Sequence, residues 1–217
     1  MWLVVGLGNP GREYAGNRHN VGFDVVTELA ARAKAPPLRE KFGAEIGEAT
    51  IRGERVLLCK PMEFMNVSGQ AVARVAKFWK IAPASIVVVH DDLDLPFGRL
   101  KLGAGGGHGG NNGVRSVIAD LGTPDFLRVR FGIGRPAPGG DAANYVLADF
   151  SRAEQKELPD LRSAAADAVE EILASGLTAA MNRFNVKKNE NPSKTDKNET
   201  KSDQKKSDKP VRSGDAQ

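Results

Sequence analysis

The chain begins with a buried strand that runs directly into a glycine-rich turn, and this start restricts the possible folds more than any other feature. The strand is predicted over residues 2–6, and the turn reads Gly6-Leu7-Gly8-Asn9-Pro10-Gly11. Its three glycines fit G-x-G-x-x-G, the pattern of dinucleotide-binding proteins. That pattern predicts a helix that opens inside the glycines, where its N-terminus meets a pyrophosphate.

Two features argue against a dinucleotide site. Pro10 interrupts the turn, and a polar loop follows it before helical periodicity begins near Val21. Glu28 has the spacing of an acid that binds a ribose, but it falls within the predicted helix and not at the end of a second strand. A tight turn with unusual backbone angles explains the glycines. The sequence therefore disfavours NAD or FAD binding, and we expect no cofactor.

Alternating strands and helices predict an α/β fold. The apolar run Ile86-Val87-Val88-Val89 is typical of a central strand covered on both faces. The predicted strands are 2–6, 44–51, 54–60, 85–90, 98–102 and 128–133, and the predicted helices are 21–33, 67–79, 112–121, 142–146, 152–175 and 177–184. This order implies a single domain with one mixed, twisted sheet flanked by helices on both faces. In such folds the site lies at the C-terminal ends of the strands.

The composition separates a folded catalytic body, residues 1–186, from a polar tail, residues 187–217. The tail holds nine Lys or Arg, six Asp or Glu and almost nothing apolar. Burial cannot offset the ordering entropy of such a segment, so we expect a disordered, lysine-rich tail that aids solubility or tethers RNA weakly. The tail carries most of the net charge of +4, so a nucleic-acid surface on the body must come from local clustering of basic residues.

The remaining composition predicts a cytoplasmic protein, with a monomer as the default expectation. No apolar run approaches the roughly 18 residues of a membrane-spanning helix, and no secretory signal precedes the first strand. The single cysteine, Cys59, cannot form an internal disulfide, which fits a reducing compartment. Cys59 lies in an apolar strand, so we expect a small buried residue and not a nucleophile.

His19 is one of three histidines, and it lies beside Arg18 in the loop that leaves the first strand. A carboxylate cluster, Asp91, Asp92 and Asp94, follows the central strand. If the two strands are neighbours, one of these residues can accept a hydrogen bond from His19, which would fix the tautomer of the ring and make it a better base. A solvated turn and a hard-cation site are the alternatives, although the cluster lacks the spacing of a calcium loop.

Two further loops carry candidate binding groups. Asn66 directly precedes a predicted helix, where it acts as an N-cap, a binding group or both. The glycine-rich segment 103–113 leads into the predicted helix from Asn112 and suits close approach of a phosphate or a main chain. Neither a G-x-S-x-G elbow nor Cys/His metal spacing occurs, and we expect no metal. The residues fit water activated by a general base, with amides that stabilise an oxyanion.

Taken together, these segments resemble bacterial-type peptidyl-tRNA hydrolase over about 1–185. The resemblance is carried by Gly6-Leu7-Gly8-Asn9-Pro10-Gly11, Tyr14, Asn17-Arg18-His19-Asn20-Val21-Gly22, Lys60-Pro61-Met62-Glu63-Phe64-Met65-Asn66-Val67-Ser68-Gly69, His90-Asp91-Asp92-Leu93-Asp94-Leu95-Pro96, 109–113 and 128–136. The family cleaves the ester between a peptide and the 3′ ribose of tRNA without a metal. The resemblance implies a carboxylic ester hydrolase of translation and ribosome rescue. Its partner would be the acceptor stem and 3′ end of peptidyl-tRNA, with no membrane and no obligate protein partner.

The resemblance also implies roles for individual residues. His19 is the general base, and Asp91 stabilises the form of His19 that is able to take a proton. Asn9 helps to discriminate peptidyl from free aminoacyl substrates. Asn66 and Asn112 hold the substrate end and polarise the region of its ester.

The same resemblance implies a peptide side and a tRNA side. Met65 helps to shape the peptide side. Tyr14 and Phe64 line the site of the tRNA 3′ end, where an aromatic ring can stack on a base. Three basic residues are candidates for phosphate contacts: Arg130, Lys101 and Arg99.

Two positions depart from the family pattern. Many relatives carry His where this chain has Asn111, which puts a proton-relay role there in doubt. Some relatives carry a basic residue near Gly103, so a phosphate contact there shifts to Lys101 or is lost. The main alternative function is a non-enzymatic RNA-binding or splicing factor on the same fold, against which the intact His19 and Asp91 argue.

Overall fold

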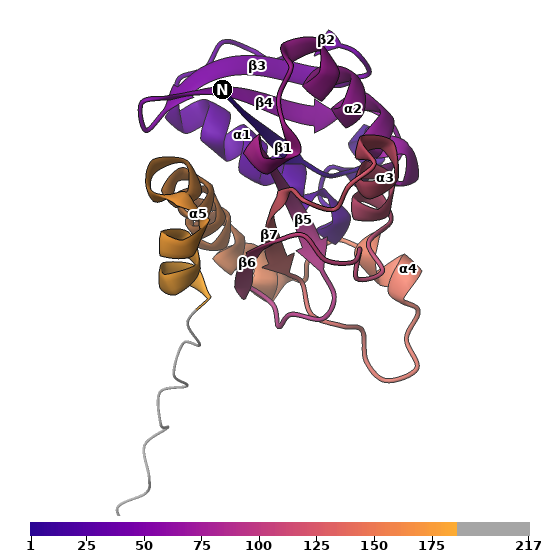
Figure 1. The fold of residues 1–217 in the computed structure, drawn as a ribbon. Helices are drawn as coiled ribbons and strands as arrows, with labels where there is room; N and C mark the ends of the chain where they lie inside the picture. The colour runs from indigo at the N-terminus through magenta and orange to yellow at the C-terminus, as the bar shows by residue number, and fades with distance from the viewer. Residues whose placement is uncertain (186–217) are drawn as a thin grey trace, which may run out of the picture. The chain divides into compact units, whose positions relative to one another are not determined.

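A computed structural model of the chain describes residues 1–185 (Figure 1), and the predicted tail, 187–217, lies outside the described residues. The described strands form one sheet in the order β2-β3-β4-β1-β5-β7-β6. Their bounds are β1 Trp2–Gly6, β2 Arg39–Lys41, β3 Ala44–Ile51, β4 Glu54–Pro61, β5 Ile86–Asp92, β6 Leu100–Ala104 and β7 Leu127–Gly132. The described residues thus have the predicted α/β fold with a mixed sheet.

The centre of the sheet is parallel and its edges are antiparallel. Strand β1 pairs in parallel with both β4 and β5, and β5 pairs in parallel with β7. Strands β3 and β2 extend one edge antiparallel, and β6 closes the other. Since β1 and β5 are parallel neighbours, with Gly6 opposite Val89, their C-terminal ends open on the same edge of the sheet.

Helices cover both faces of the sheet (Figure 1). Their bounds are α1 Val21–Arg32, α2 Ser68–Trp79, α3 Asn112–Leu121, α4 Ala142–Val146 and α5 Arg152–Phe184, with short 3-10 turns η1 Arg12–Tyr14, η2 Arg18–Asn20, η3 Met65–Val67 and η4 Pro83–Ser85. Alternate residues of a strand point to opposite faces, so Val4 packs in the core beneath α1 and α5, whereas Leu3 and Val5 pack beneath α2 and α3.

The glycines of the first turn serve close packing. A Cβ atom on Gly6 would lie 2.1 Å from the carbonyl oxygen of Gly22, so α1 packs directly on the end of β1. Gly11 has a φ of 116°, which an L side chain rarely adopts. Helix α1 begins only at Val21, beyond the glycines, and its N-terminus is not positioned as in a dinucleotide-binding turn.

The structure differs from the sequence prediction chiefly in three strands, and one of them, β6, spans Leu100–Ala104 where the sequence predicts 98–102. Strand β2 was not predicted because its three residues are all exposed and show no apolar alternation. Strand β5 runs to Asp92 and not to His90, so Asp91 belongs to the sheet itself. Helix α5 contains non-helical backbone at Gly176 (φ 80°), which lies between the two helices predicted there.

Two further predictions concern single features. Cys59 is fully buried, and burial raises the pKa of its thiol to about 12, as expected of an unreactive strand residue. None of the helices described in residues 1–185 is long and apolar enough to cross a membrane.

Candidate active site

His19 and Asp91 meet where β1 and β5 end. His19 lies in η2, which follows the turn after β1, and Asp91 is the sixth residue of the buried strand β5. The Nδ1 atom of His19 is 2.8 Å from Oδ1 of Asp91, and the two residues are 8% and 2% exposed. With Nδ1 directed to this carboxylate, Nε2 is the ring nitrogen left to act on a substrate or a water molecule.

Asn111 contacts the same carboxylate oxygen as His19. Its Nδ2 donates to Oδ1 of Asp91 at 2.9 Å, while its Oδ1 accepts from the backbone N–H of Val114 at 3.0 Å. The second contact caps α3 and fixes which way the amide faces. Asn111 therefore ties the start of α3 to the acid of the pair, which is a role that sequence reasoning did not foresee.

His90 precedes Asp91 and is a structural residue of the same strand end. Its Nδ1 lies 2.8 Å from the carbonyl oxygen of Asp91, and the residue is 4% exposed. Burial lowers the pKa of this imidazole, although the carboxylates of Asp91 and Asp92 oppose the shift, so the ring stays neutral at pH 7. A neutral ring that donates from Nδ1 to the Asp91 carbonyl adds a second anchor to this position.

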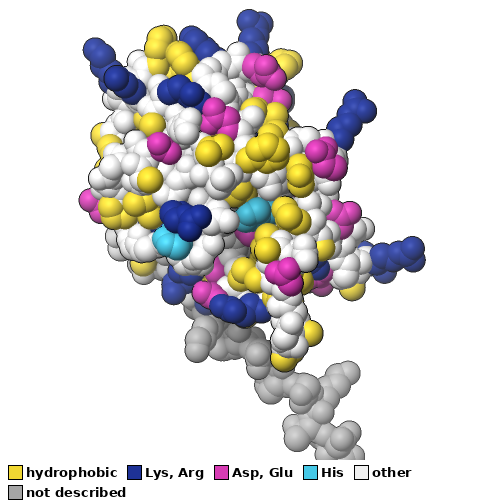
Figure 2. Space-filling model, turned by 90° about the vertical axis from the view of Figure 1, so that its right-hand side faces the viewer, with side chains coloured by type: hydrophobic (Ala, Val, Ile, Leu, Met, Phe, Trp, Pro, Cys, Tyr) yellow, Lys and Arg dark blue, Asp and Glu magenta, His cyan; other side chains and the backbone are white. Residues whose placement is uncertain are grey.

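A cavity of about 400 Å³ opens beside the pair. Its lining includes His19, Asp91, the glycine-rich loop 103–110, both Asn111 and Asn112, and wall residues Ala142, Ala143 and Val146 of α4. Its floor is the part of the sheet where His90, Arg130 and Lys101 lie opposite one another across β5, β7 and β6. On the face drawn in Figure 2, histidine side chains reach the surface beside hydrophobic and basic side chains.

Arg128 fixes the glycine loop above this floor. Its Nη1 and Nη2 donate to the carbonyl oxygens of Gly107 and Gly106 at 2.6 and 2.8 Å, and the residue is 5% exposed. Burial lowers the pKa of the guanidinium, with a further contribution from the charge of Arg130. Arg128 was not singled out from the sequence, because an arginine in a strand carries no local sign of the carbonyl oxygens to which it will donate.

The other carboxylates of the Asp cluster are engaged by arginines. Oδ2 of Asp92 pairs with Nε of Arg130, and Oδ1 of Asp94 pairs with Arg135. Within residues 1–185, no group of three or more His, Cys, Asp and Glu side chains is arranged to hold a metal ion. Arg130 therefore lines the cavity as part of an ion pair, while Lys101 is exposed at its edge.

Asn9 follows β1, which lies on the other side of β5 from β7 and β6. Its backbone N–H and C=O bond to the side chain of Asn20 at 2.8 and 2.9 Å. Its side-chain Oδ1 accepts from the backbone N–H of Met65 at 2.8 Å. Asn9 thereby joins the turn after β1 to the loop that contains Asn66, and its Nδ2 remains as a donor.

The predicted residues of the loop before α2 do not line the cavity. Met65 is buried, and its Sδ would lie 2.4 Å from a Cβ on Gly113, which places the loop beside the start of α3. Asn66 is exposed within η3, and no side-chain hydrogen bond caps α2, so the predicted N-cap role of Asn66 is wrong. Phe64 is 59% exposed.

Tyr14 and Arg99 stand further from the cavity. Tyr14 is half-buried in η1 and is not among the residues that line it. Arg99 donates through Nη2 to the carbonyl oxygen of Asn185 at 2.7 Å, at the end of α5. The structure therefore brings His19, Asp91, Asn112, Arg130 and Lys101 to one cavity, with Asn9, Met65 and Asn66 on an adjoining wall.

Comparison with known proteins shows which family the sequence and the fold match. The family model described as Peptidyl-tRNA hydrolase matches residues 3–193. Curated relatives named peptidyl-tRNA hydrolase include those of Frankia alni, 52% identical over 85% of this chain and 94% of the relative, and Pseudarthrobacter chlorophenolicus, 53% identical over 86% and 96%. The crystal structure of peptidyl-tRNA hydrolase from Acinetobacter baumannii superposes with a TM-score of 0.80 and 39% identity, over 85% of this chain and 94% of that one.

Proposed function

The chain belongs to the peptidyl-tRNA hydrolase family, and we propose that its His19–Asp91 pair activates the water that cleaves the ester between a peptide and the 3′ ribose of tRNA. It is a carboxylic ester hydrolase by membership of that family. The observation that carries the proposed mechanism is the 2.8 Å contact between Nδ1 of His19 and Oδ1 of Asp91 at the wall of a basic cavity.

His19 acts as the general base. Its Nε2 removes a proton from water as the oxygen attacks the ester carbonyl carbon, and Asp91 stabilises the imidazolium that forms. The tetrahedral intermediate then collapses, and the bond to the 3′ ribose oxygen breaks. That oxygen takes the proton back from His19, so the products are a peptide carboxylic acid and a tRNA with a free hydroxyl. An ester is more reactive than an amide, so one base with a few donors suffices for this step.

Asparagine amides stabilise the developing oxyanion. Asn112 opens α3 and lines the cavity beside His19, and Asn66 is exposed on the adjoining wall. Each side chain offers N–H donors that the structure leaves without a protein acceptor among the described residues. Donors of this kind, when they bond the carbonyl oxygen, stabilise the charge that develops there in the transition state.

Asn9 provides selectivity for peptidyl over free aminoacyl substrates. Its Oδ1 is engaged by Met65 N–H, so its Nδ2 is oriented to bond the carbonyl of the first peptide unit. A free aminoacyl group has an α-ammonium in place of that amide, and the ammonium would meet only donors here. Unpaired polar groups then disfavour the wrong substrate.

The basic floor of the cavity binds the nucleic-acid side of the substrate. Lys101 and Arg130 lie opposite each other on β6 and β7, and both line the cavity. Contacts to phosphates give affinity without reading sequence, which suits an enzyme that serves all tRNAs. The exposed ring of Phe64 is available to stack on a base at the 3′ end, with Tyr14 as a second candidate.

A single-turnover assay tests this function. N-acetyl-aminoacyl-tRNA and free aminoacyl-tRNA are compared with the same excess of enzyme, with and without EDTA. We expect release from the N-blocked substrate, little release from the free one, and no loss of rate in EDTA. Equal cleavage of both substrates would refute the proposed selectivity, and absence of cleavage would favour an RNA-binding factor without catalysis.

A further inference from the structure

We propose that Arg18, which no step of the reaction uses, is the positioning residue that holds His19 in place for catalysis. This inference rests on the proposed function of His19 as the base. The Arg18 side chain is 8% exposed, although arginine is among the residues least often buried. A buried guanidinium next to the base in sequence, with its donors turned away from the cavity, indicates a role in holding the backbone there.

The guanidinium of Arg18 clamps η2 to the segment between α4 and α5. Its Nη1 donates to the carbonyl oxygens of Ala148 and Asp149, and its Nη2 donates to Oε2 of Glu154 at 2.8 Å. The backbone adds two contacts, an N–H of Arg18 bonded to Ala148 O at 3.1 Å and a bridge between Asn17 and Asp149. Residues distant in sequence thus fix one side of η2 through a planar group with several donors.

Aromatic rings enclose the same guanidinium. Its Cζ atom lies 4.3 Å from the ring centroid of Tyr145 and 5.2 Å from that of Phe150. The Tyr145 hydroxyl donates to the carbonyl oxygen of Ile133 at 2.9 Å, so the ring is anchored to the chain just after β7. The clamp is therefore connected to the sheet and not only to a surface loop.

The acceptor Glu154 is itself held in position. It forms a capping box with Ser151 at the start of α5, where Glu154 Oε2 accepts from Ser151 N–H at 2.7 Å. Burial would raise the pKa of Glu154, but the hydrogen bonds from Ser151 and the charge of Arg18 hold it below its usual value. The carboxylate is thus charged at pH 7 and fixed by the helix before it meets Arg18.

The two sides of η2 are fixed independently, and His19 lies between them. Arg18 fixes one side to 145–154, and Asn20 fixes the other by two bonds to the backbone of Asn9. Nδ1 of His19 is within 2.8 Å of Asp91, yet it forms no well-aligned hydrogen bond there. Its placement depends on η2, and an error of about 1 Å in a catalytic group can lower a rate by about a hundredfold.

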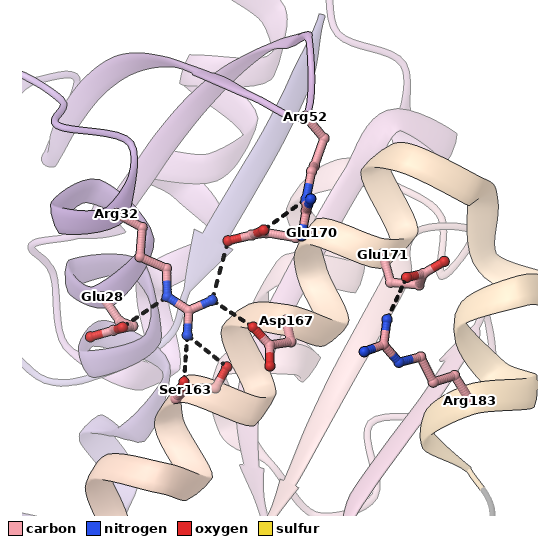
Figure 3. A network of polar contacts seen from close by, with 8 residues as sticks. All are labelled: Glu28, Arg32, Arg52, Ser163, Asp167, Glu170, Glu171 and Arg183. Atoms are coloured by element: carbon pink, nitrogen blue, oxygen red, sulfur yellow. Dashed lines mark hydrogen bonds and ion pairs between the residues drawn. The ribbon is translucent and has the colours of Figure 1, made fainter.

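The test compares Arg18→Met with a matched loss of another arginine clamp. Figure 3 shows Arg32, whose guanidinium ties α1 to α5 through Asp167, Glu170 and Ser163 and also bonds Glu28 of its own helix. Both substitutions keep an unbranched side chain about as long as the aliphatic part of arginine and remove a guanidinium that bonds several acceptors, but Arg32 is not a residue of the active site. We expect Arg18→Met to lower kcat about 10- to 100-fold with KM within about threefold of wild type. We expect Arg32→Met to change neither by more than about threefold.

A second readout follows His19 without substrate. The chain has three histidines, so the ring signals in a ¹H–¹³C spectrum are few, and His19→Ala identifies the one that belongs to His19. We expect this signal to shift or broaden in Arg18→Met and to remain in place in Arg32→Met. Arg18→Lys keeps the positive charge but loses the planar guanidinium with its several N–H donors, and we expect it to restore kcat only in part.

The outcomes separate the two proposals. If Arg18→Met has the kcat of the wild type and an unmoved His19 signal, the positioning role is overturned. The proposed function still stands in that case, because the wild-type enzyme hydrolyses the substrate. A rise in KM at constant kcat also overturns it, because it assigns Arg18 to binding. If Arg18→Met does not fold, Glu154→Gln weakens the same clamp, and an unchanged kcat in that variant overturns the inference. A wild-type enzyme without hydrolysis refutes the proposed function, and the NMR comparison still tests the placement of His19.

Discussion

Nδ1 of His19 and Oδ1 of Asp91 lie 2.8 Å apart because β1 and β5 are parallel neighbours in the sheet. His19 follows β1 in the chain, and Asp91 belongs to β5. For His19→Ala we expect single-turnover cleavage of N-acetyl-aminoacyl-tRNA to slow at least about a hundredfold, in the range for loss of a general base. Binding of deacylated tRNA, measured by filter retention, should stay within about threefold, since phosphate contacts carry the affinity. If the variant cleaves the substrate as fast as the wild type, His19 is not the general base.

Substitutions of Asn111 can separate catalysis from stability, because its Nδ2 donates to Asp91 whereas its Oδ1 caps α3. Asn111→Ser keeps an oxygen that can cap α3 but loses the N–H donor to Asp91. We expect a lower kcat with a free energy of unfolding within about 1 kcal/mol of wild type. Asn111→Ala should lower kcat to the same extent as Asn111→Ser. Its free energy of unfolding, measured with urea, should also be lower by about 0.5–2 kcal/mol, because the cap of α3 is lost. Full activity in both variants would show that the Asp91 contact is dispensable.

Asn9→Asp tests how the enzyme rejects free aminoacyl-tRNA. The new carboxylate keeps an acceptor for Met65 N–H but replaces the amide donor with a charge that attracts an α-ammonium. We expect slower cleavage of the N-acetylated substrate and a smaller ratio between the rates for the two substrates, by about tenfold or more. Asn9→Ala is the control, because it removes the donor without adding charge. An unchanged ratio in Asn9→Asp would place selectivity elsewhere.

Asp24 gives the protein a pH-dependent stability. Burial raises the pKa of this carboxyl from 3.8 to about 6, although the charges of Arg162 and Lys60 oppose the shift. The folded state binds this proton more tightly than the unfolded chain, so the contribution of Asp24 to the free energy of unfolding falls as pH rises from about 4 to about 6. The change is at most about 3 kcal/mol for a shift of this size.

Asp24→Asn removes this titration. Urea unfolding of both proteins between pH 4 and 7 should show the variant gaining stability relative to wild type across that window. The ion pair with Arg162 forms only when Asp24 is charged, so its effect is already contained in this raised pKa. Parallel curves would mean that Asp24 titrates normally in the folded protein.

The layers of the fold were accessible from the sequence, and the order of its strands was not. The apolar run of β5 and the helical spacing in α1 are local patterns, and the structure has both elements, with β5 extended to Asp92. Which strands pair depends on contacts distant in sequence, such as Gly6 opposite Val89, that leave no periodic signal. The edge strand β2 is exposed and therefore lacks the alternation by which strands are recognised.

The candidate site shows the same division. His19 and the Asp cluster were identified from their positions after strands, and their meeting was conditional on strand adjacency, which the structure provides. Arg128 and Arg18 were not identified, because an arginine in a strand or loop gives no sign that carbonyl oxygens elsewhere will accept from it. Arg130 was expected at a phosphate and lies in an ion pair with Asp92 in the absence of substrate.

The parallel pairing of β1 with β5 also bears on the synthesis of this protein. While it is being translated, the chain is itself esterified to tRNA, the very linkage that its mature form hydrolyses. His19 emerges from the ribosome early, but its carboxylate is in β5 and the arginine that fixes the glycine loop is in β7. A growing chain that ends before Asp91 carries the proposed base without its proposed partner. The site can therefore be completed only after most of the folded domain has been synthesised.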